Sequence, residues 1–160
     1  MTRFQIREAR NSDSAAVIDL IAATYLEYPD CQLDVEADEP QLLQPASYYE
    51  SKGGKFWVVE ADEGAVVGSI ACVPVPGGCQ LYNLYVSPQM RGSGLAHKLF
   101  EQAHAYAHER EAGAIILWTD IRFERAHRFY ERLGFKRGPM LRSLADESWS
   151  VEYFYRLNLG

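Results

Sequence analysis

Two glycines one residue apart stand where a strand-like segment gives way to a helix-like one. The run Gln89-Met90-Arg91-Gly92-Ser93-Gly94-Leu95-Ala96 follows the apolar segment 81–86. Glycine lets a backbone turn sharply and present successive N–H groups without interference from a Cβ atom. The helix predicted over 95–110 places those N–H groups at its positive end. Together, the strand, turn and helix N-terminus predict a site for the diphosphate of a nucleotide-like cofactor.

Two better-known phosphate motifs do not fit this run. A dinucleotide fingerprint requires G-x-G-x-x-G after the first strand of a parallel unit. Here histidine occupies the place of the third glycine, in Gly92-Ser93-Gly94-Leu95-Ala96-His97, and a strand meander precedes it. No Gly-Lys-Ser/Thr follows, which excludes a P-loop.

Other residue types with chemical potential form no comparable pattern. His97, His104 and His108 lie on one predicted helix, but no third ligand accompanies them, so no metal site is predicted. The three cysteines are odd in number and lack C-x-x-C spacing, which argues against disulfides and zinc and fits a cytoplasmic location.

The elements that position the glycine turn can be read from periodicity and turn residues. Proline, glycine and acidic clusters separate apolar runs, and the segment with Pro29, Pro40 and Pro45 is expected to be a long loop. Strands are expected over 4–9, 56–61, 65–75, 79–86, 114–118, from 135 onward and over 149–157. Helices are expected over 16–25, 46–52, 95–110 and 123–133. This order predicts one mixed α/β domain over residues 1–160, with a partly antiparallel sheet flanked by helices.

Composition limits the possible partners. The chain has 160 residues, 48% of them hydrophobic and 24% charged, with a formal net charge of −6. The negative charge argues against nucleic acid as the main partner. No apolar run approaches the roughly 20 residues of a membrane span, so no membrane partner is expected. Six acids and no base lie within 27–39, and this segment is either a solvated face or a surface that attracts a cationic substrate.

Two separate motifs carry a resemblance to a known family. The run 84–96, with its Gln/Arg-x-x-Gly-x-Gly/Ala pattern after a strand, resembles the acetyl-CoA signature of the Gcn5-related N-acetyltransferase (GNAT) superfamily. The run 126–135, with its Phe-Tyr and Gly-Phe pairs, resembles that family's late helix and turn. The predicted order of elements is similar to the family's fold over nearly the whole chain.

The resemblance assigns the cofactor acetyl-CoA to particular residues. In the family the fourth and fifth strands splay apart and leave a cleft for pantetheine, which the backbone of Leu84, Tyr85 and Val86 would line here. The N–H group of Val86 would polarise the thioester carbonyl. The pyrophosphate would be held by the N–H groups of six consecutive residues: Arg91, Gly92, Ser93, Gly94, Leu95 and Ala96. Many members carry an asparagine where this chain has Phe123, so Phe123 is given no cofactor role.

The chemistry that the resemblance implies is acetyl transfer to a primary amine by direct attack. Tyr130 is the expected general acid, because a phenol stays protonated at neutral pH and can donate to the departing sulfur. The general base stays open between Asp120, Glu27 and a water chain through Asn83 or Tyr85.

Separate segments of the sequence bear on the acceptor and on the assembly. The acidic segment 27–39 favours a small or peptide amine that is cationic, whereas Tyr25, Tyr28, Tyr48 and Tyr49 favour a flatter, more apolar one. The alternating segment 149–155 is expected to form a sheet edge, through which a homodimer is possible. A non-catalytic acyl-CoA-binding module of the same fold is the alternative function.

Overall fold

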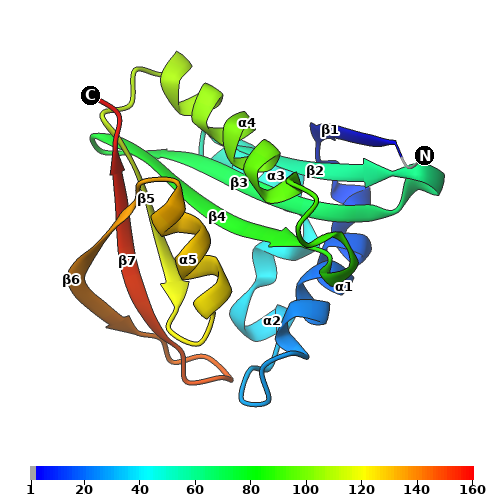
Figure 1. Ribbon diagram of the computed structural model, residues 1–160. Coiled ribbons are helices and arrows are strands. Elements are labelled where there is room, and N and C mark those ends of the chain that lie inside the picture. Colours follow the sequence, from blue (N-terminus) through cyan, green and yellow to red (C-terminus); the bar gives the residue numbers. More distant parts are fainter. Residues whose placement is uncertain (1–2) are drawn as a thin grey trace.

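Local sequence signals and the observed element boundaries agree closely. The computed structural model describes residues 3–160, so residues 1 and 2 of the predicted domain lie outside the described residues (Figure 1). The strands are β1 (Phe4–Glu8), β2 (Lys55–Ala61), β3 (Val66–Val75), β4 (Gly78–Val86), β5 (Ala114–Asp120), β6 (Lys136–Ser143) and β7 (Val151–Asn158). The helices are α1 (Ser14–Tyr25), α2 (Val35–Asp38), α3 (Pro45–Ser51), α4 (Leu95–Glu109) and α5 (Glu124–Arg132).

The strands form one seven-stranded sheet in the order β1-β2-β3-β4-β5-β7-β6. Pairing is antiparallel from β1 to β4 and from β5 through β7 to β6, and it is parallel only between β4 and β5. This arrangement confirms the predicted mixed α/β class with a partly antiparallel sheet.

The parallel pair at the centre separates soon after it begins. Only Cys79 and Gln80 of β4 pair with β5, opposite Ile115 and Ile116. Beyond that point the two strands diverge toward their carboxyl ends, as Figure 1 shows. We call the space between the diverging strands the fork. The rest of the β4 edge that faces β5 therefore has no ladder partner within residues 3–160.

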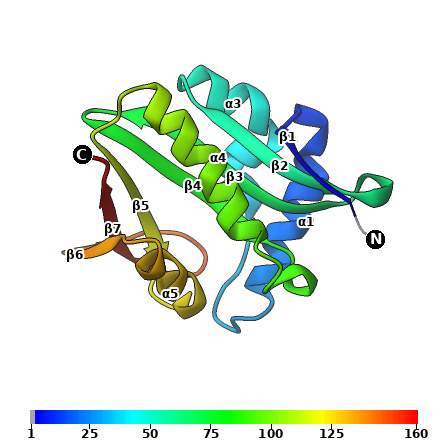
Figure 2. The ribbon, with the colours of Figure 1, turned by 45° about the horizontal axis from the view of Figure 1, so that its top comes forward.

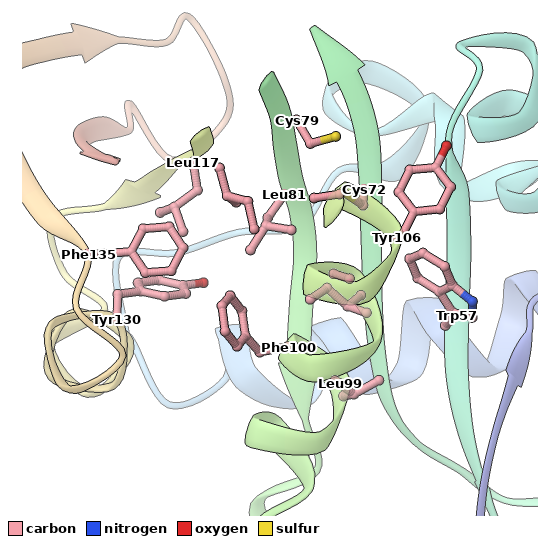
Figure 3. Packing of buried hydrophobic residues seen from close by; sticks show 14 of the residues in the cluster. Trp57, Cys72, Cys79, Leu81, Leu99, Phe100, Tyr106, Leu117, Tyr130 and Phe135 are labelled. Atoms are coloured by element: carbon pink, nitrogen blue, oxygen red, sulfur yellow. The ribbon is translucent and has the colours of Figure 1, made fainter. Parts of the chain in front are cut away.

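Helices cover both faces of the sheet and create two cores. On one face, α4 lies across β3 and β4 while α5 lies over the β5 half (Figures 1 and 2). The apolar stripe of α4, with Leu95, Leu99 and Ala103, is buried in the larger core. Helix α5 contributes Tyr130 to the same core, as Figure 3 shows. On the opposite face, α1 and α3 pack against β2, β3 and β4 around Tyr49. Leu95, Leu99 and Ala103 follow one another at helical spacing, which places them on one face of α4.

The last helix ends where its glycine predicts. Gly134 has a φ of +100°, a left-handed conformation that favours glycine after a helix. The N–H of Phe135 then donates to the Tyr130 carbonyl at 3.0 Å. This turn fixes the end of α5 and, with it, the position of Tyr130.

Two sequence expectations are wrong. The segment 149–155 is no sheet edge: β7 lies between β5 and β6, because β5 offers a full antiparallel ladder from Ala114↔Asn158 to Asp120↔Glu152. The edges are β1 and β6 instead. The expected structureless loop also contains α2, which begins where Asp34 accepts a hydrogen bond from the N–H of Ala37 at 3.1 Å.

No helix within residues 3–160 combines the length and the apolar character that crossing a membrane requires.

Candidate active site

The segment after β4 forms the turn that the sequence predicted. A 3-10 turn at Pro88–Met90 leads into Gly92 and Gly94, whose φ angles are +78° and +86°. A Cβ atom at either glycine would meet open space, so the left-handed backbone, and not crowding, is what favours glycine there. Helix α4 begins directly after Gly94, which occupies its N-cap position without a side-chain cap.

The six predicted N–H groups of this loop divide into two sets. Those of Arg91, Ser93 and Leu95 already point to internal acceptors, with N···O distances of 3.4, 3.2 and 3.4 Å. Within residues 3–160, the other three have no internal acceptor; they belong to Gly92, Gly94 and Ala96. Free N–H groups at the positive end of a 15-residue helix attract an anion. These three N–H groups are therefore available to bind an anion such as a phosphate.

The fork exposes the backbone of β4 beside this loop. Because β4 leaves β5 after Gln80, the peptide groups of Leu84, Tyr85 and Val86 face the fork on one side. The strand bulges at Asn83, which has a φ of +52° and whose carbonyl accepts from the Ser69 hydroxyl at 2.7 Å. After the bulge, the side chains of Leu84 and Val86 pack against the larger core and Tyr85 against the second core. This edge can pair with the amides of an extended ligand arm.

A cavity of about 440 Å³ joins the loop, the fork and α5. The predicted acid Tyr130 and all the residues predicted to hold the cofactor line it except Ser93, whose hydroxyl instead donates to the Met90 carbonyl. Of the predicted base candidates, Tyr85 lines the cavity, whereas Glu27, Asn83 and Asp120 do not. The structure thus brings together groups that lie more than 40 positions apart in the chain. The cavity lining comprises Thr24, Tyr28, Leu84, Tyr85, Val86, Met90, Arg91, Gly92, Gly94, Leu95, Ala96, His97, Phe123, Arg125, Ala126, Phe129, Tyr130 and Arg132.

Tyr130 reaches the cavity from α5 and is otherwise enclosed by aromatic rings. Its side chain is 7% exposed, and it packs against Phe129, Phe135 and Tyr155 with ring centroids 5.7 to 5.9 Å apart. Burial raises the pKa of Tyr130 above its usual value, because the phenolate would lose its solvation. The hydroxyl is therefore held protonated next to β4.

Arg91 does not extend freely toward the cavity. Its guanidinium forms a two-pronged ion pair with Glu27, with Nη1 2.8 Å from Oε2, and Arg125 lies 3.6 Å from the same carboxylate. The hydrogen bond from Arg91 lowers the pKa of Glu27. A carboxylate with a lowered pKa that is already bonded to two arginines is a poor proton acceptor.

Asp120, the other candidate base, is also occupied. Its carboxylate accepts from the Arg122 backbone N–H at 2.8 Å and from the Arg122 guanidinium at 2.7 and 2.9 Å. Burial alone would raise the pKa of Asp120, but the bonds from Arg122 outweigh it and the pKa is lowered. Asn83 donates to the Tyr49 hydroxyl at 2.7 Å, and burial raises the pKa of Tyr85 well above its usual value. None of these groups is set up as a strong base.

Several cavity residues have no counterpart in the sequence prediction. Phe123 lines the cavity and packs against Tyr28, with ring centroids 5.0 Å apart, although no role was given to it. Arg125 and Arg132 project from α5 into the same space. Their spacing of seven on one helix, within the basic run 122–137, was the signal that could have placed them together.

The part of the chain that the structure describes contains no preformed metal site. Residues 3–160 contain no group of three or more histidine, cysteine, aspartate and glutamate side chains arranged to hold a metal ion. His97 instead approaches Glu101, one helical turn away, at 3.0 Å.

Comparison with known proteins agrees with this geometry. The model of the acetyltransferase (GNAT) family matches residues 16–135. Among curated proteins, the uncharacterized N-acetyltransferase YjgM of Escherichia coli K12 is 36% identical over 102 residues, which are 61% of this chain and 60% of YjgM. N-acetyltransferase 8 of Rattus norvegicus is 33% identical over 97 residues, 57% of this chain and 43% of the rat protein. The matches thus span about half the length of these curated relatives.

Solved structures share the architecture over the whole chain. An acetyltransferase of the GNAT family from Staphylococcus aureus Mu50 superposes with a TM-score of 0.85 at 22% identity, covering 99% of this chain and all of the other. An acetyltransferase from Streptococcus agalactiae gives 0.75 at 27% identity, covering 98% of each chain. The protein yncA from Salmonella typhimurium, solved with its cofactor acetyl-CoA, gives 0.71 at 19% identity, covering 99% of this chain and 95% of yncA.

Proposed function

The chain belongs to the acetyltransferase (GNAT) family, and from this premise we propose that it transfers the acetyl group of acetyl-CoA to a primary amine. One observation carries the proposal: a single cavity contains a helix N-terminus with free N–H groups, an unpaired strand edge and a buried tyrosine hydroxyl. These three features match, in order, the pyrophosphate, the pantetheine amides and the thiol leaving group of one ligand.

The residues present fit acetyl-CoA. The free N–H groups of Gly92, Gly94 and Ala96, with the α4 dipole, would hold the pyrophosphate, and Arg91 and Arg125 add positive charge nearby. The peptide groups of β4 would bond the pantetheine amides along the fork. The N–H of Val86 would polarise the thioester carbonyl by donating to its oxygen. When bound, acetyl-CoA supplies the activated acetyl group.

The protein's part in the transfer is to position the reactants and to supply one proton. The amine nitrogen forms a bond to the carbonyl carbon as the carbon–sulfur bond breaks. Tyr130 donates its hydroxyl proton to the departing sulfur and regains one from water, while the nitrogen loses its extra proton to water. A strong side-chain base is unnecessary, since the basic and apolar lining lowers the pKa of an incoming ammonium group. The amine therefore reacts in its neutral form.

A non-catalytic acyl-CoA-binding module is the second candidate. It is favoured by Phe123, an apolar residue at the start of α5 that offers no hydrogen bond to the cofactor. Tyr130 argues against it, because a buried phenol facing the cavity has no evident use in binding alone.

We further propose that the enzyme acts in the cytoplasm without nucleic acid, membrane or metal. A homodimer stays a prediction. If it forms by strand pairing, the exposed edges β1 and β6 are the ones that can take part, because β7 is enclosed.

Calorimetric titration with acetyl-CoA tests the proposal. We expect micromolar binding by the wild type and its loss in Gly94→Val, because valine cannot easily adopt the φ of +86° that aims the loop. Gly77→Val is the matched control: Gly77 also has a positive φ, +79°, and open space around it, but it lies in the turn between β3 and β4. Absence of wild-type binding, or equal loss in both variants, would contradict the proposal.

A further inference from the structure

The cavity extends beyond the groups that would hold acetyl-CoA. Its far end is lined by Thr24, in the last turn of α1, and by Tyr28, just after that helix. Helix α1 packs on the sheet face opposite to α4 and α5. The cavity therefore passes through the fork from one face of the sheet to the other. The α1 end is the part left for the second substrate.

Three aromatic rings form a wall at this end. Phe123 packs against Tyr28 and Tyr25, with ring centroids 5.0 and 6.0 Å apart and tilted planes, within the range of favourable aromatic pairs. We call these three residues the aromatic wall. Two of them, Tyr28 and Phe123, line the cavity directly, and Tyr25 supports them from behind.

The wall is held in place by its backbone. The N–H of Phe123 donates to the Asp120 carbonyl at 3.0 Å, and the Phe123 carbonyl accepts from the His127 N–H at 3.2 Å. On the other side, the Tyr28 N–H donates to the Tyr25 carbonyl at 3.0 Å. Glu27, which lies between the two tyrosines in the sequence, forms ion pairs with Arg125 of α5 and with Arg91 of the glycine turn before α4. The rings therefore present a preformed surface.

The charged side chains that line the cavity are basic, and Glu27, which lies outside the lining, forms ion pairs with two of them, Arg91 and Arg125. Among the described residues, the ionisable basic side chains of the lining are those of Arg91, Arg125, Arg132 and His97, and no aspartate or glutamate lines it. This lining suits the phosphates of acetyl-CoA and repels a substrate with several positive charges.

The acidic segment 27–39 does not reverse this conclusion, because none of its carboxylates lines the cavity, and several of them accept hydrogen bonds from internal partners. Glu27 bonds Arg91, Asp34 caps α2, Asp38 accepts the Glu147 N–H at 3.0 Å, and Glu39 accepts from the Gln41 amide.

We infer that the acceptor is a primary amine whose remaining part is an uncharged, flat apolar group, which packs against Tyr28 and Phe123. This inference rests on the proposed function and narrows its substrate class. The amine nitrogen would pass the wall to reach the thioester near Tyr130. The cationic amine that the acidic segment 27–39 favours is the competing hypothesis.

Acceptor kinetics with two model amines test the inference. The probes are 2-phenylethylamine and 1,4-diaminobutane, assayed by thiol release at saturating acetyl-CoA, with the acetyl-CoA Kd of every variant measured by calorimetry. We expect the wild-type kcat/KM to favour 2-phenylethylamine by about tenfold or more. Truncation of the wall, in Phe123→Ala or Tyr28→Ala, should lower kcat/KM for 2-phenylethylamine about tenfold, mainly through KM. It should leave the acetyl-CoA Kd within about twofold.

Leu26→Ala provides the matched control, because Leu26 lies in the same turn but is 86% exposed and does not line the cavity. Leu26→Ala should leave both kcat/KM for 2-phenylethylamine and the acetyl-CoA Kd unchanged. If Phe123→Ala fails to fold, as judged by circular dichroism, Tyr28→Ala still tests the inference, because Tyr28 belongs to a different segment that lines the same cavity.

The possible results separate this inference from the proposed function. If acetyl-CoA binds but diaminobutane is the better substrate, the acceptor inference is wrong and the acetyltransferase assignment stands. If the aromatic-wall variants raise the acetyl-CoA Kd by as large a factor as they raise the amine KM, the aromatic wall belongs to the cofactor site and the inference also fails. If acetyl-CoA binds and neither amine is acetylated, the inference fails and the non-catalytic module gains support. If acetyl-CoA does not bind, both proposals fail.

Discussion

Replacing Tyr130 by phenylalanine removes one hydroxyl from the cavity and changes little else. The Tyr130 ring contacts Phe129, Phe135 and Tyr155 through its faces and edges, and a phenylalanine ring keeps those contacts. The side chain is 7% exposed, so the variant ring stays in the same enclosed place. We therefore expect the free energy of unfolding to change by less than about 1 kcal/mol.

The catalytic effect should be much larger. Loss of a general acid typically costs on the order of 10² to 10⁴ in rate, and here the thiolate would have to leave unprotonated. Because burial raises the pKa of Tyr130, the hydroxyl is protonated throughout the neutral and mildly alkaline range. The rate ratio between wild type and variant should therefore be constant from about pH 6 to pH 9. No binding contact of acetyl-CoA is assigned to the hydroxyl, so its Kd should change by less than about twofold.

The assay is single-turnover thiol release with acetyl-CoA prebound and an amine in excess, alongside calorimetry for the Kd. Tyr155→Phe is a suitable control, since Tyr155 is also buried beside α5 but its hydroxyl bonds Glu131 at 2.7 Å and it does not line the cavity. A Tyr130→Phe rate within threefold of wild type would refute the acid role. So would an equal loss of rate and acetyl-CoA affinity, which would make Tyr130 a binding residue.

Three further expectations follow from the ion pairs and the cavity lining. Glu27→Gln should tighten acetyl-CoA binding by roughly twofold to fivefold, because it frees Arg91 and removes a negative charge near the phosphates. Calorimetry measures this affinity, with the exposed acid variant Glu36→Gln as the control. A lower affinity of Glu27→Gln than of wild type would contradict the prediction. Asp13→Asn should lower the free energy of unfolding by about 2 to 4 kcal/mol at pH 7, because Asp13 is buried and accepts hydrogen bonds from Arg7 at 2.8 and 2.9 Å. The hydrogen bond from Arg7 lowers the pKa of Asp13 in the folded state. The stabilisation by Asp13 is therefore present above its unfolded-state pKa and is lost as the pH falls through its lower folded-state pKa. Urea unfolding at pH 7 and pH 3 should show the gap between wild type and Asp13→Asn narrowing, and an unchanged gap would refute this linkage. Finally, kcat/KM for the amine should rise with pH through the amine's own titration range. It should show no further loss at acidic pH from protonation of Glu27 or Asp120, because the pKa values of both are lowered. A loss at acidic pH that is abolished in Asp120→Asn would identify Asp120 as the base.

The part of the site built from one continuous segment was predictable from the sequence. The strand, glycine turn and helix over 81–110 carry their own signals: an apolar alternation, Pro88, two glycines that need positive φ, and an amphipathic stripe. Gly134 marks the end of α5 in the same local way. Because Tyr130 lies four residues before that glycine, its position on the last helix was also readable.

Contacts between distant segments were not predictable in this way. Nothing within 149–158 indicates that β7 pairs with β5 along its whole length. Polar and apolar residues can alternate both in an inner strand with one exposed face and in an edge strand, so the alternation does not tell the two apart. The ion pair between Glu27 and Arg91 spans 64 positions and depends on where α1 ends in space. Phe123 was read as the lack of a polar group, and only the fold shows that its ring meets Tyr28 across the fork.

Carbon-13 NMR of the protein with acetyl-CoA labelled at the acetyl carbonyl tests the central claim most directly. The sample would contain a mixture of 2-phenylethylamine and 1,4-diaminobutane, so that the apolar and the cationic acceptor class are both represented. We predict that the thioester carbonyl signal is replaced by an amide carbonyl signal in the presence of wild-type protein, and far more slowly with Tyr130→Phe. A thioester signal that is perturbed by binding but persists unchanged would contradict the account and identify a protein that binds acetyl-CoA without transferring its acetyl group.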